Sequence, residues 1–170
     1  YWPRPWVNLI CRDGFSGRRM IAITQSGFDE IKWLELDAET GDILENGFDL
    51  PAARASVDWM EEDRLLVAIG TGATDTGATG YPLTVRLLRR DERLSDATII
   101  YRAPANADSV HVPTGRNVGA QYRIITASEG ARIIDEKFVH PDGHLIPLDF
   151  PVDVVPLGVQ NKDAIIALLE

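Results

Sequence analysis

The sequence predicts an all-β fold, and three observations support this prediction. Apolar residues come in short runs of roughly four to eight, the usual length of a strand, rather than in long stretches with a helical period. Turn-forming residues separate the runs, as in Asp37-Ala38-Glu39-Thr40-Gly41 and His140-Pro141-Asp142-Gly143, where an Asp accepts turn hydrogen bonds and a Gly adopts positive φ. The runs recur about every ten to fifteen residues, which is typical of successive antiparallel hairpins.

In the first half of the chain, each expected strand is an apolar or alternating run that ends at turn residues or charges. These strands are expected over residues 7–10, 19–24, 30–36, 56–60 and 64–69. The last two flank the acidic residues Glu61-Glu62-Asp63, which suit a hairpin turn.

In the second half, Arg90-Asp91-Glu92 and Ser128-Glu129-Gly130 separate further apolar runs in the same way. Strands are expected there over residues 83–89, 98–101, 109–112, 122–127, 132–139, 144–148, 152–155 and 163–169.

Two of these segments also have features of helices. Phe28, Ile31 and Leu34 lie at helical spacing, but Trp33 and Leu36 would spread apolar surface around a helix, so a strand is favoured. The last strand is rich in Ala and Leu, which favour helix, and its Ile pair favours strand.

Sequential hairpins of this number can form a sandwich, a barrel or the four-stranded blades of a β-propeller. The hairpin groups restart near Ser56 and Ser109, a loose period of about fifty residues that favours blades. We therefore expect antiparallel four-stranded blades of a partial β-propeller over residues 1–170, about three blades plus part of a fourth. Because a closed ring needs at least four blades, the segment is expected either to belong to a longer chain or to cover its apolar faces by self-association with a second copy.

The composition limits the choice of partners and compartment. Seventeen basic and 26 acidic residues leave a net charge of -9, which disfavours nucleic acid and anionic membranes as partners. Cys11 has no second cysteine to pair with, and no apolar run approaches the length of a membrane span. We expect a cytoplasmic protein. The start at Tyr1-Trp2-Pro3-Arg4, without an initiator methionine or signal peptide, suggests a segment of a longer chain.

Two glycine-containing stretches resemble catalytic or nucleotide-binding motifs without satisfying them. Gly14-Phe15-Ser16-Gly17-Arg18 has Arg18 where a nucleophile elbow needs a small residue. Residues 70–80 contain only Gly, Ala, Thr and one Asp, with none of the lysine that a phosphate-binding loop uses. They are expected to form a mobile surface loop, and no cofactor is predicted.

The same loop contains Asp75-Thr76-Gly77-Ala78, the active-site pattern of aspartic proteases. With one copy per chain, two chains would have to bring their Asp75 side chains together to share a proton. The apolar strand that should lead directly to the aspartate is interrupted by Gly72-Ala73-Thr74, and Gly115-Arg116-Asn117 only partly matches the later signature of these enzymes. A dimeric retropepsin-like protease is therefore a remote alternative.

Other polar clusters give weak functional signals. The histidines are His111, His140 and His144. His140 and His144 flank a turn and could converge with Asp142 on a metal ion, while Cys11 lies far away in sequence. A solvated turn is favoured, so no metal site is predicted. The acidic groups Glu61-Glu62-Asp63 and Asp135-Glu136 are expected to be solvated surface charge with ordinary pKa values. Accordingly, no catalytic residue is assigned within this chain.

An ordered series of short patterns resembles the propeller domain of bacterial prolyl-oligopeptidase-type serine peptidases. The patterns are Ser26-Gly27-Phe28-Asp29, Asp37-Ala38-Glu39-Thr40, Gly47-Phe48-Asp49-Leu50-Pro51-Ala52-Ala53, Trp59, Asp63-Arg64-Leu65-Leu66-Val67 and Gly80-Tyr81-Pro82. The likeness is strongest over residues 19–102 and continues through Asp149-Phe150-Pro151 and Ile165-Ile166-Ala167-Leu168. Leu83 departs from the family, which usually has a basic residue after Tyr-Pro.

The resemblance implies a longer two-domain enzyme that hydrolyses short peptides. Its propeller would cap an α/β-hydrolase domain bearing a Ser, Asp and His triad, and would admit only short, flexible peptides. On that basis this segment is non-catalytic, and its partners are the hydrolase domain and short peptide substrates. Trp2, Trp6, Trp33 and Trp59 are candidates for contacts between blades. The alternative is a stand-alone β-propeller-like binding or scaffold protein.

Overall fold

The fold is all-β in the part of the chain that the structure describes. The computed structural model describes the backbone of residues 7–11, 18–24, 30–37, 39–112, 123–140, 142–148, 154–160 and 164–169. Side chains are described within residues 30–37, 39–112, 123–140 and 142–148. No helix in these ranges has the length and apolar character needed to cross a membrane.

The strands form consecutive antiparallel sheets in which each strand pairs with its neighbour in the chain. The first sheet contains β1 (Val7–Cys11), β2 (Arg18–Thr24), β3 (Ile31–Asp37) and β4 (Asp49–Ala53). The second contains β5 (Ala55–Glu61), β6 (Arg64–Ile69), β7 (Thr84–Arg89) and β8 (Thr98–Arg102). The third contains β9 (Ser109–His111), β10 (Arg123–Glu129), β11 (Arg132–Val139) and β12 (Leu145–Pro147). A final pair is formed by β13 (Val154–Gln160) and β14 (Ala164–Leu169).

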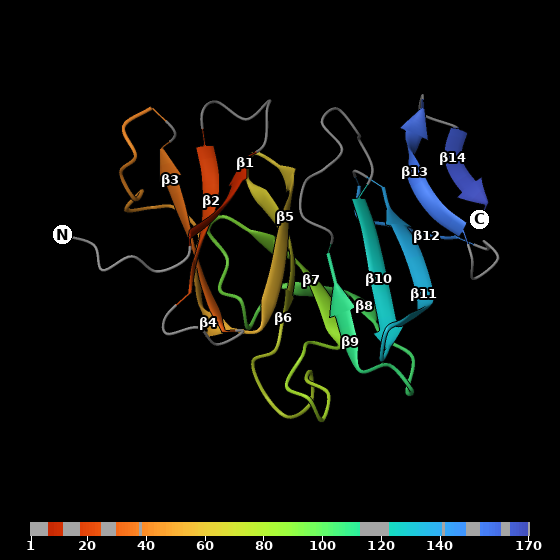
Figure 1. Cartoon of the computed structure of the whole chain (residues 1–170). Helices are drawn as coiled ribbons and strands as arrows, with labels where there is room; N and C mark the ends of the chain where they lie inside the picture. The colour runs from red at the N-terminus through yellow and green to blue at the C-terminus, as the bar shows by residue number, and fades with distance from the viewer. Residues whose placement is uncertain are drawn as a thin grey trace.

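The sheets stand side by side in chain order, as Figure 1 shows from red to blue. The predicted all-β fold of antiparallel four-stranded sheets is therefore confirmed, and the described residues form three four-stranded sheets and one two-stranded sheet. The segment with helical spacing forms β3, and the C-terminal segment forms β14.

Strand β4 is missing from the sequence prediction because Pro51 lies in its middle. Proline cannot donate to a strand ladder and is tolerated mainly in edge strands. The structure places β4 at the edge of its sheet, paired only with β3. The predicted strand 152–155 was also too short. Strand β13 continues through Pro156 and Gly158, where a register shift accommodates both residues.

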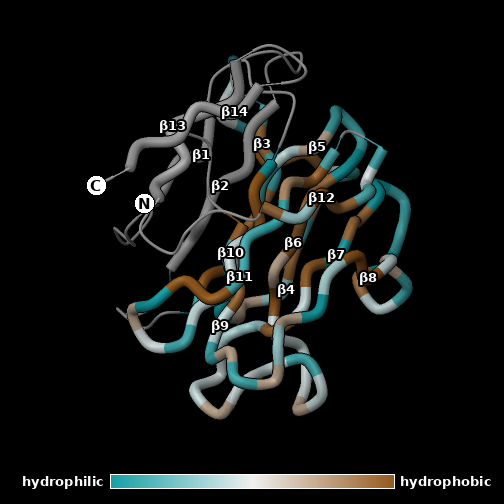
Figure 2. The backbone as a smooth tube through the Cα atoms, turned by 90° about the vertical axis from the view of Figure 1, so that its right-hand side faces the viewer, coloured by the Kyte–Doolittle hydropathy of each residue, from teal (hydrophilic) through white to brown (hydrophobic). Residues whose placement is uncertain are grey.

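The second sheet is buried on both faces. Leu65, Leu66, Val67, Ala68 and Ile69 of β6 all have 0% exposure. Since successive side chains of a strand point to opposite faces, this continuous apolar run can serve two cores at once. Figure 2 shows hydrophobic positions along β6 and β7.

One core joins the first sheet to the second. It combines Trp33, Phe48 and Leu50 with Val57, Trp59, Leu65, Val67 and Ile69. The rings of Phe48 and Trp59 meet edge to face at 5.6 Å, a favourable geometry for aromatic pairs. Trp33 and Trp59 therefore make the contact between sheets that the sequence indicated, whereas Trp2 and Trp6 lie outside the described residues.

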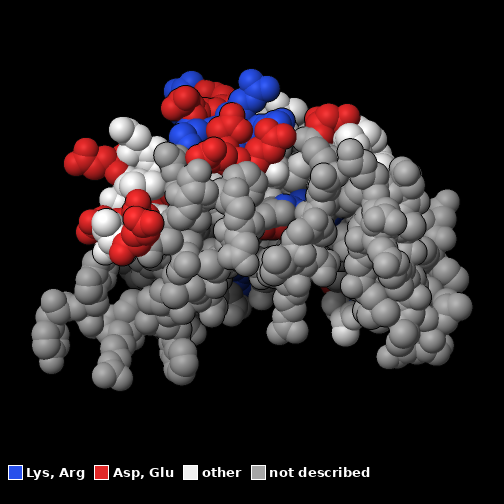
Figure 3. Space-filling view, turned by 90° about the horizontal axis from the view of Figure 1, so that it is seen from above, with Lys and Arg blue, Asp and Glu red and all other residues white. Residues whose placement is uncertain are grey.

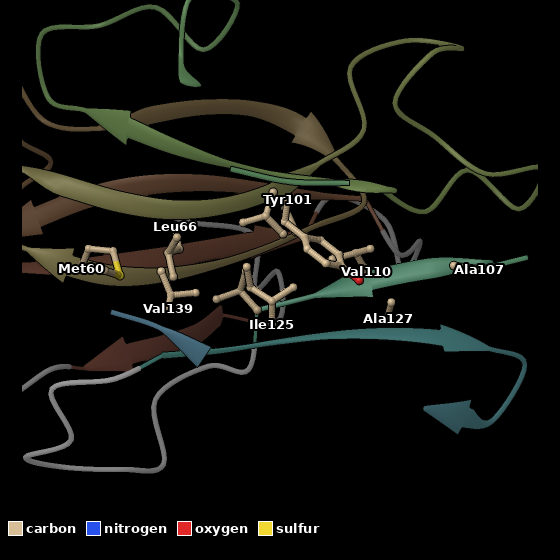
Figure 4. Packing of buried hydrophobic residues seen from close by; sticks show 11 residues of the cluster. Met60, Leu66, Tyr101, Ala107, Val110, Ile125, Ala127 and Val139 are labelled. Atoms are coloured by element: carbon tan, nitrogen blue, oxygen red, sulfur yellow. The ribbon is translucent and has the colours of Figure 1, made fainter. Parts of the chain in front are cut away.

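The other core joins the second sheet to the third (Figure 4). It combines residues of the second sheet with residues from β9, β10 and β11 of the third; among its members are Met60, Leu66, Tyr101, Val110, Ile125, Ala127 and Val139.

A buried ion pair accompanies each core. Between the second and third sheets, Nε of Arg123 lies 2.8 Å from Oδ2 of Asp58 and donates to the Trp59 carbonyl. Between the first and second sheets, Arg90 bonds both carboxylate oxygens of Glu35 and donates to the Glu62 carbonyl at 2.7 Å. Each ion pair connects two neighbouring sheets through directional contacts. The two pairs therefore help to fix the position of each sheet relative to the next.

Replacing Arg123 with Leu should lower the free energy of unfolding by about 3–5 kcal/mol, because the buried Asp58 carboxylate would lose its counter-charge. Chemical denaturation measures the effect. The exposed Arg132 provides the matched control R132L, with an expected change within about 0.5 kcal/mol. Equal losses in the two variants would show that the Arg123–Asp58 pair does not join the sheets.

Candidate functional site

A small cleft lies where the first three sheets meet the loop between β6 and β7. It encloses about 220 Å³ and is lined by Ile31, Arg54, Ala55, Ser56, Tyr81, Pro82 and His111. Ligand pockets usually enclose about 300–1,000 Å³. The cleft is thus large enough for a side chain or two, but small for an entire substrate.

The polar groups of the cleft are held by their neighbours. The Arg54 guanidinium lies 4.5 Å from the centre of the Tyr81 ring and donates to the Thr79 carbonyl. The His111 ring lies 5.9 Å from the Tyr81 ring. Removal of water from around His111 lowers its pKa below the usual value. The Ser56 hydroxyl accepts a hydrogen bond from the Val112 amide at 2.9 Å.

The loop that carries Asp75 lies mostly at the surface, as expected, and hydrogen bonds to the Asp75 side chain organise it. Its mobility stays a prediction. Asp75 is buried, and its Oδ1 accepts hydrogen bonds from the amides of Thr71 and Gly72 at 3.1 and 2.8 Å. Its Oδ2 accepts one from the Thr71 hydroxyl at 2.8 Å and lies 3.3 Å from Nη2 of Arg86. The composition of the loop does not reveal these contacts, because one buried carboxylate makes them all.

Close packing explains the loop's small residues. A Cβ on Gly70 would lie 2.2 Å from Cγ2 of Thr76, so only glycine fits there. Thr76 and Pro82 form an isolated antiparallel bridge, and the Leu83 amide donates to the Asp75 carbonyl at 2.8 Å.

The environment of Asp75 is unsuited to an aspartic protease. Burial acts to raise its pKa, but the hydrogen bonds from Thr71, Gly72 and Arg86 outweigh burial and hold the pKa below its usual value. A protease dyad needs a carboxylate that can share a proton with its twin. Here both oxygens accept hydrogen bonds from the loop, and one also pairs with Arg86, so these contacts of Asp75 stabilise the loop.

The turn histidines are brought together with Asp142, as the metal alternative required. Nδ1 of His140 and Nδ1 of His144 lie 2.9 and 2.5 Å from the same oxygen, Oδ1 of Asp142. All three side chains are at least partly exposed. The two imidazole rings also stack on each other, with centroids 4.5 Å apart.

The two acidic groups have different environments. Glu62 and Asp63 are exposed and Glu61 pairs with Arg64, which agrees with the predicted surface charge. For Asp135 and Glu136 the prediction was wrong. The Tyr101 hydroxyl donates to Asp135 at 2.7 Å across the joint between β8 and β11. Burial and the neighbouring Asp135 charge raise the pKa of Glu136.

A mixed-charge depression lies at the turns that follow β5 and β7. It encloses about 630 Å³ between Asp63, Arg89, Arg90, Asp91, Glu92, Arg93 and Asp96. Figure 3 shows acidic and basic side chains intermingled on the upper face. Arg93 pairs with Asp96 at 2.7 Å and Arg90 with Glu35, so these arginines have acidic partners within the chain.

Several sequence candidates fall where side chains are not described. The Gly14–Arg18 motif lies mainly outside the described residues, as does Gly115-Arg116-Asn117. Only the backbone of Cys11 is described, at the end of β1.

The chain is similar to proteins that are named as peptide-cleaving enzymes. No family model matches the chain. An uncharacterized peptidase, y4nA, from Sinorhizobium fredii is 24% identical over 160 residues, which cover 91% of this chain. A post-proline cleaving enzyme from Rickettsia typhi matches 91% of this chain with a TM-score of 0.75 and 18% identity. The predicted likeness to prolyl-oligopeptidase-type peptidases is confirmed.

The coverage of the relatives is small. The chain spans 22% of the Sinorhizobium peptidase and 25% of the Rickettsia enzyme chain. The peptidase-like segment thus corresponds in length to a minor part of each of these proteins.

Asp75→Asn should lower the free energy of unfolding by about 2 kcal/mol, because an amide cannot replace a carboxylate between Thr71 and Arg86. Limited proteolysis should then cut within residues 71–80 faster than in the unchanged chain. The exposed Asp91 supplies the control D91N, for which cleavage should not change. Unaltered protease sensitivity in D75N would contradict the ordering role of Asp75.

Tyr101 should make the fold sensitive to alkali. Burial, together with the hydrogen bond and charge of Asp135, raises the pKa of Tyr101. Above about pH 10 the unfolded chain ionises this phenol while the folded chain keeps it protonated, so stability falls as pH rises. Tyr101→Phe should cost about 1 kcal/mol at neutral pH and flatten this decline. Urea denaturation from pH 7 to 11 measures both effects, and parallel curves would contradict them.

Proposed function

We propose that this chain is a non-catalytic, substrate-gating part of a longer prolyl-oligopeptidase-type serine peptidase that hydrolyses short peptides. The observation that carries the proposal is the match to the post-proline cleaving enzyme, which includes 91% of this chain but 25% of that enzyme. Such a match fits one structural section of a larger peptidase.

The arrangement of the sheets supports a gating role. Consecutive four-stranded antiparallel sheets placed side by side are the repeating unit of propellers. If further sheets complete a ring, its central passage admits substrates by width. The joints at Asp58–Arg123 and Glu35–Arg90 would keep that width constant, because buried ion pairs resist sliding of one sheet over the next.

The chemistry of the described side chains supports a non-catalytic segment. Asp75 is bound to Arg86 and its own loop, and the Ser56 hydroxyl accepts a hydrogen bond from a backbone amide. His140 and His144 face Asp142. The serine nucleophile and its partners would then belong to an α/β-hydrolase domain elsewhere in the same protein, acting on short peptides. A cytoplasmic location is part of the proposal.

Active-site labelling tests the assignment. In the full-length protein, a fluorophosphonate probe should label one serine outside residues 1–170, and the isolated chain should remain unlabelled. Peptide mapping by mass spectrometry locates the label. Modification of Ser56 or of another serine within this segment would overturn the non-catalytic role, and an unlabelled full-length protein would overturn the serine-type assignment.

Gating predicts a selective effect of loosening a joint between sheets. In the full-length protein, Tyr101→Phe and Arg123→Leu should leave cleavage of a short peptide unchanged but raise cleavage of a long, unstructured polypeptide severalfold. R132L is the surface control. Equal changes for both substrates would argue against a filter, since a general loss of folding affects every substrate alike.

A further inference from the structure

The turn between β11 and β12 gathers three metal-binding side chains. Nδ1 of His140, Nδ1 of His144 and a carboxylate oxygen of Asp142 all lie within 4.8 Å of one another. The two imidazole rings stack with centroids 4.5 Å apart, so both present the same edge to Asp142. This convergence is independent of the cleft and of the proposed gating role.

The backbone of the turn holds this arrangement in place. The His140 amide donates to the His144 carbonyl at 3.0 Å, and the Gly143 amide donates to the His140 carbonyl at 2.8 Å. Gly143 has a φ of 91°, a backbone angle that residues other than glycine rarely adopt. The His144 amide donates to Oδ1 of Asp142 at 3.0 Å and orients the carboxylate toward the Nδ1 atoms of both rings. The ligand atoms are therefore assembled before any ion binds.

Electrostatics favour a cation among these atoms. Two ring nitrogens and a carboxylate oxygen carry lone pairs, so their close approach needs a proton or a metal ion between them. The site thus offers one carboxylate oxygen and two imidazole nitrogens as ligand atoms, all within 4.8 Å of one another.

We propose that His140, Asp142 and His144 form a surface site for a divalent transition-metal ion of the zinc type. Two imidazole nitrogens and one carboxylate oxygen suit zinc, nickel or copper, whereas calcium and magnesium prefer oxygen donors. Zinc bonds of about 2.0–2.2 Å hold ligand atoms roughly 3.3 Å apart, so small side-chain rotations would complete the site. Water or a group from a partner would fill the fourth position.

A bound ion would stabilise the pairing of β12, the edge strand of the third sheet, with β11. Strand β12 pairs with β11 through three residue pairs, ending at Val139 and Leu145. His140 and His144 directly follow and precede these paired positions, so one ion would close the hairpin at its turn. We expect zinc to raise the thermal stability of the chain through this closure.

Calorimetric titration of the 170-residue chain with zinc chloride tests the proposal. One ion should bind per chain, and His140→Gln, His144→Gln and Asp142→Asn should each weaken binding more than about tenfold. His111→Gln is the matched control, because His111 lies in the cleft next to Tyr81 and should leave binding unchanged. Circular dichroism verifies that each variant folds.

Cobalt substitution supplies a second readout. Co²⁺ added to the unchanged chain should give visible d–d absorption of a four-coordinate site, and the double variant H140Q/H144Q should lose it. Absence of saturable zinc binding at 100 μM (roughly 5–6 kcal/mol of binding free energy) would overturn the proposal. So would zinc binding that survives all three ligand substitutions, since the ion would then lie elsewhere.

Discussion

Burial of the second sheet on both faces is the constraint on which the rest of the structure depends. The side chains of β6 alternate between a core shared with the first sheet and a core shared with the third. With all of Leu65 to Ile69 inaccessible, the second sheet cannot be hydrated on either face without exposing a core. The second sheet therefore needs both the first and the third sheet to cover its faces. Because each sheet packs on the next in this way, the sheets follow one another along the chain.

Two ion pairs add directional contacts to the apolar packing between the sheets. Apolar contacts alone tolerate small shifts between sheets, because hydrophobic burial has no strong directionality. The Glu35–Arg90 and Asp58–Arg123 pairs add directional contacts that connect residues far apart in sequence. Their value is geometric, since buried ion pairs often add little net stability over apolar residues of the same size.

The loop at Asp75 shows how similar sequence patterns serve different purposes. In aspartic proteases the Asp of this pattern shares a proton with a second Asp. Here Thr71, Gly72 and Arg86 hold the Asp75 carboxylate, and these contacts stabilise a loop beside the cleft. The contacts of the carboxylate, rather than the tetrapeptide, distinguish the two roles.

Sequence alone determined the all-β class and nearly every strand, because apolar periodicity and turn residues act locally. The resemblance to a peptidase rested instead on an ordered series of short patterns. The sequence missed β4, since Pro51 is acceptable only at a sheet edge and edges are defined by tertiary pairing. It did not reveal the contacts of Asp75 and Asp135, whose partners Arg86 and Tyr101 lie 11 and 34 residues away. The sequence indicated that His140 and His144 could converge with Asp142, although it favoured a solvated turn. The orientation of the two rings depends on the folded backbone. Local patterns decide which strands form, and only the packed chain decides which charges meet.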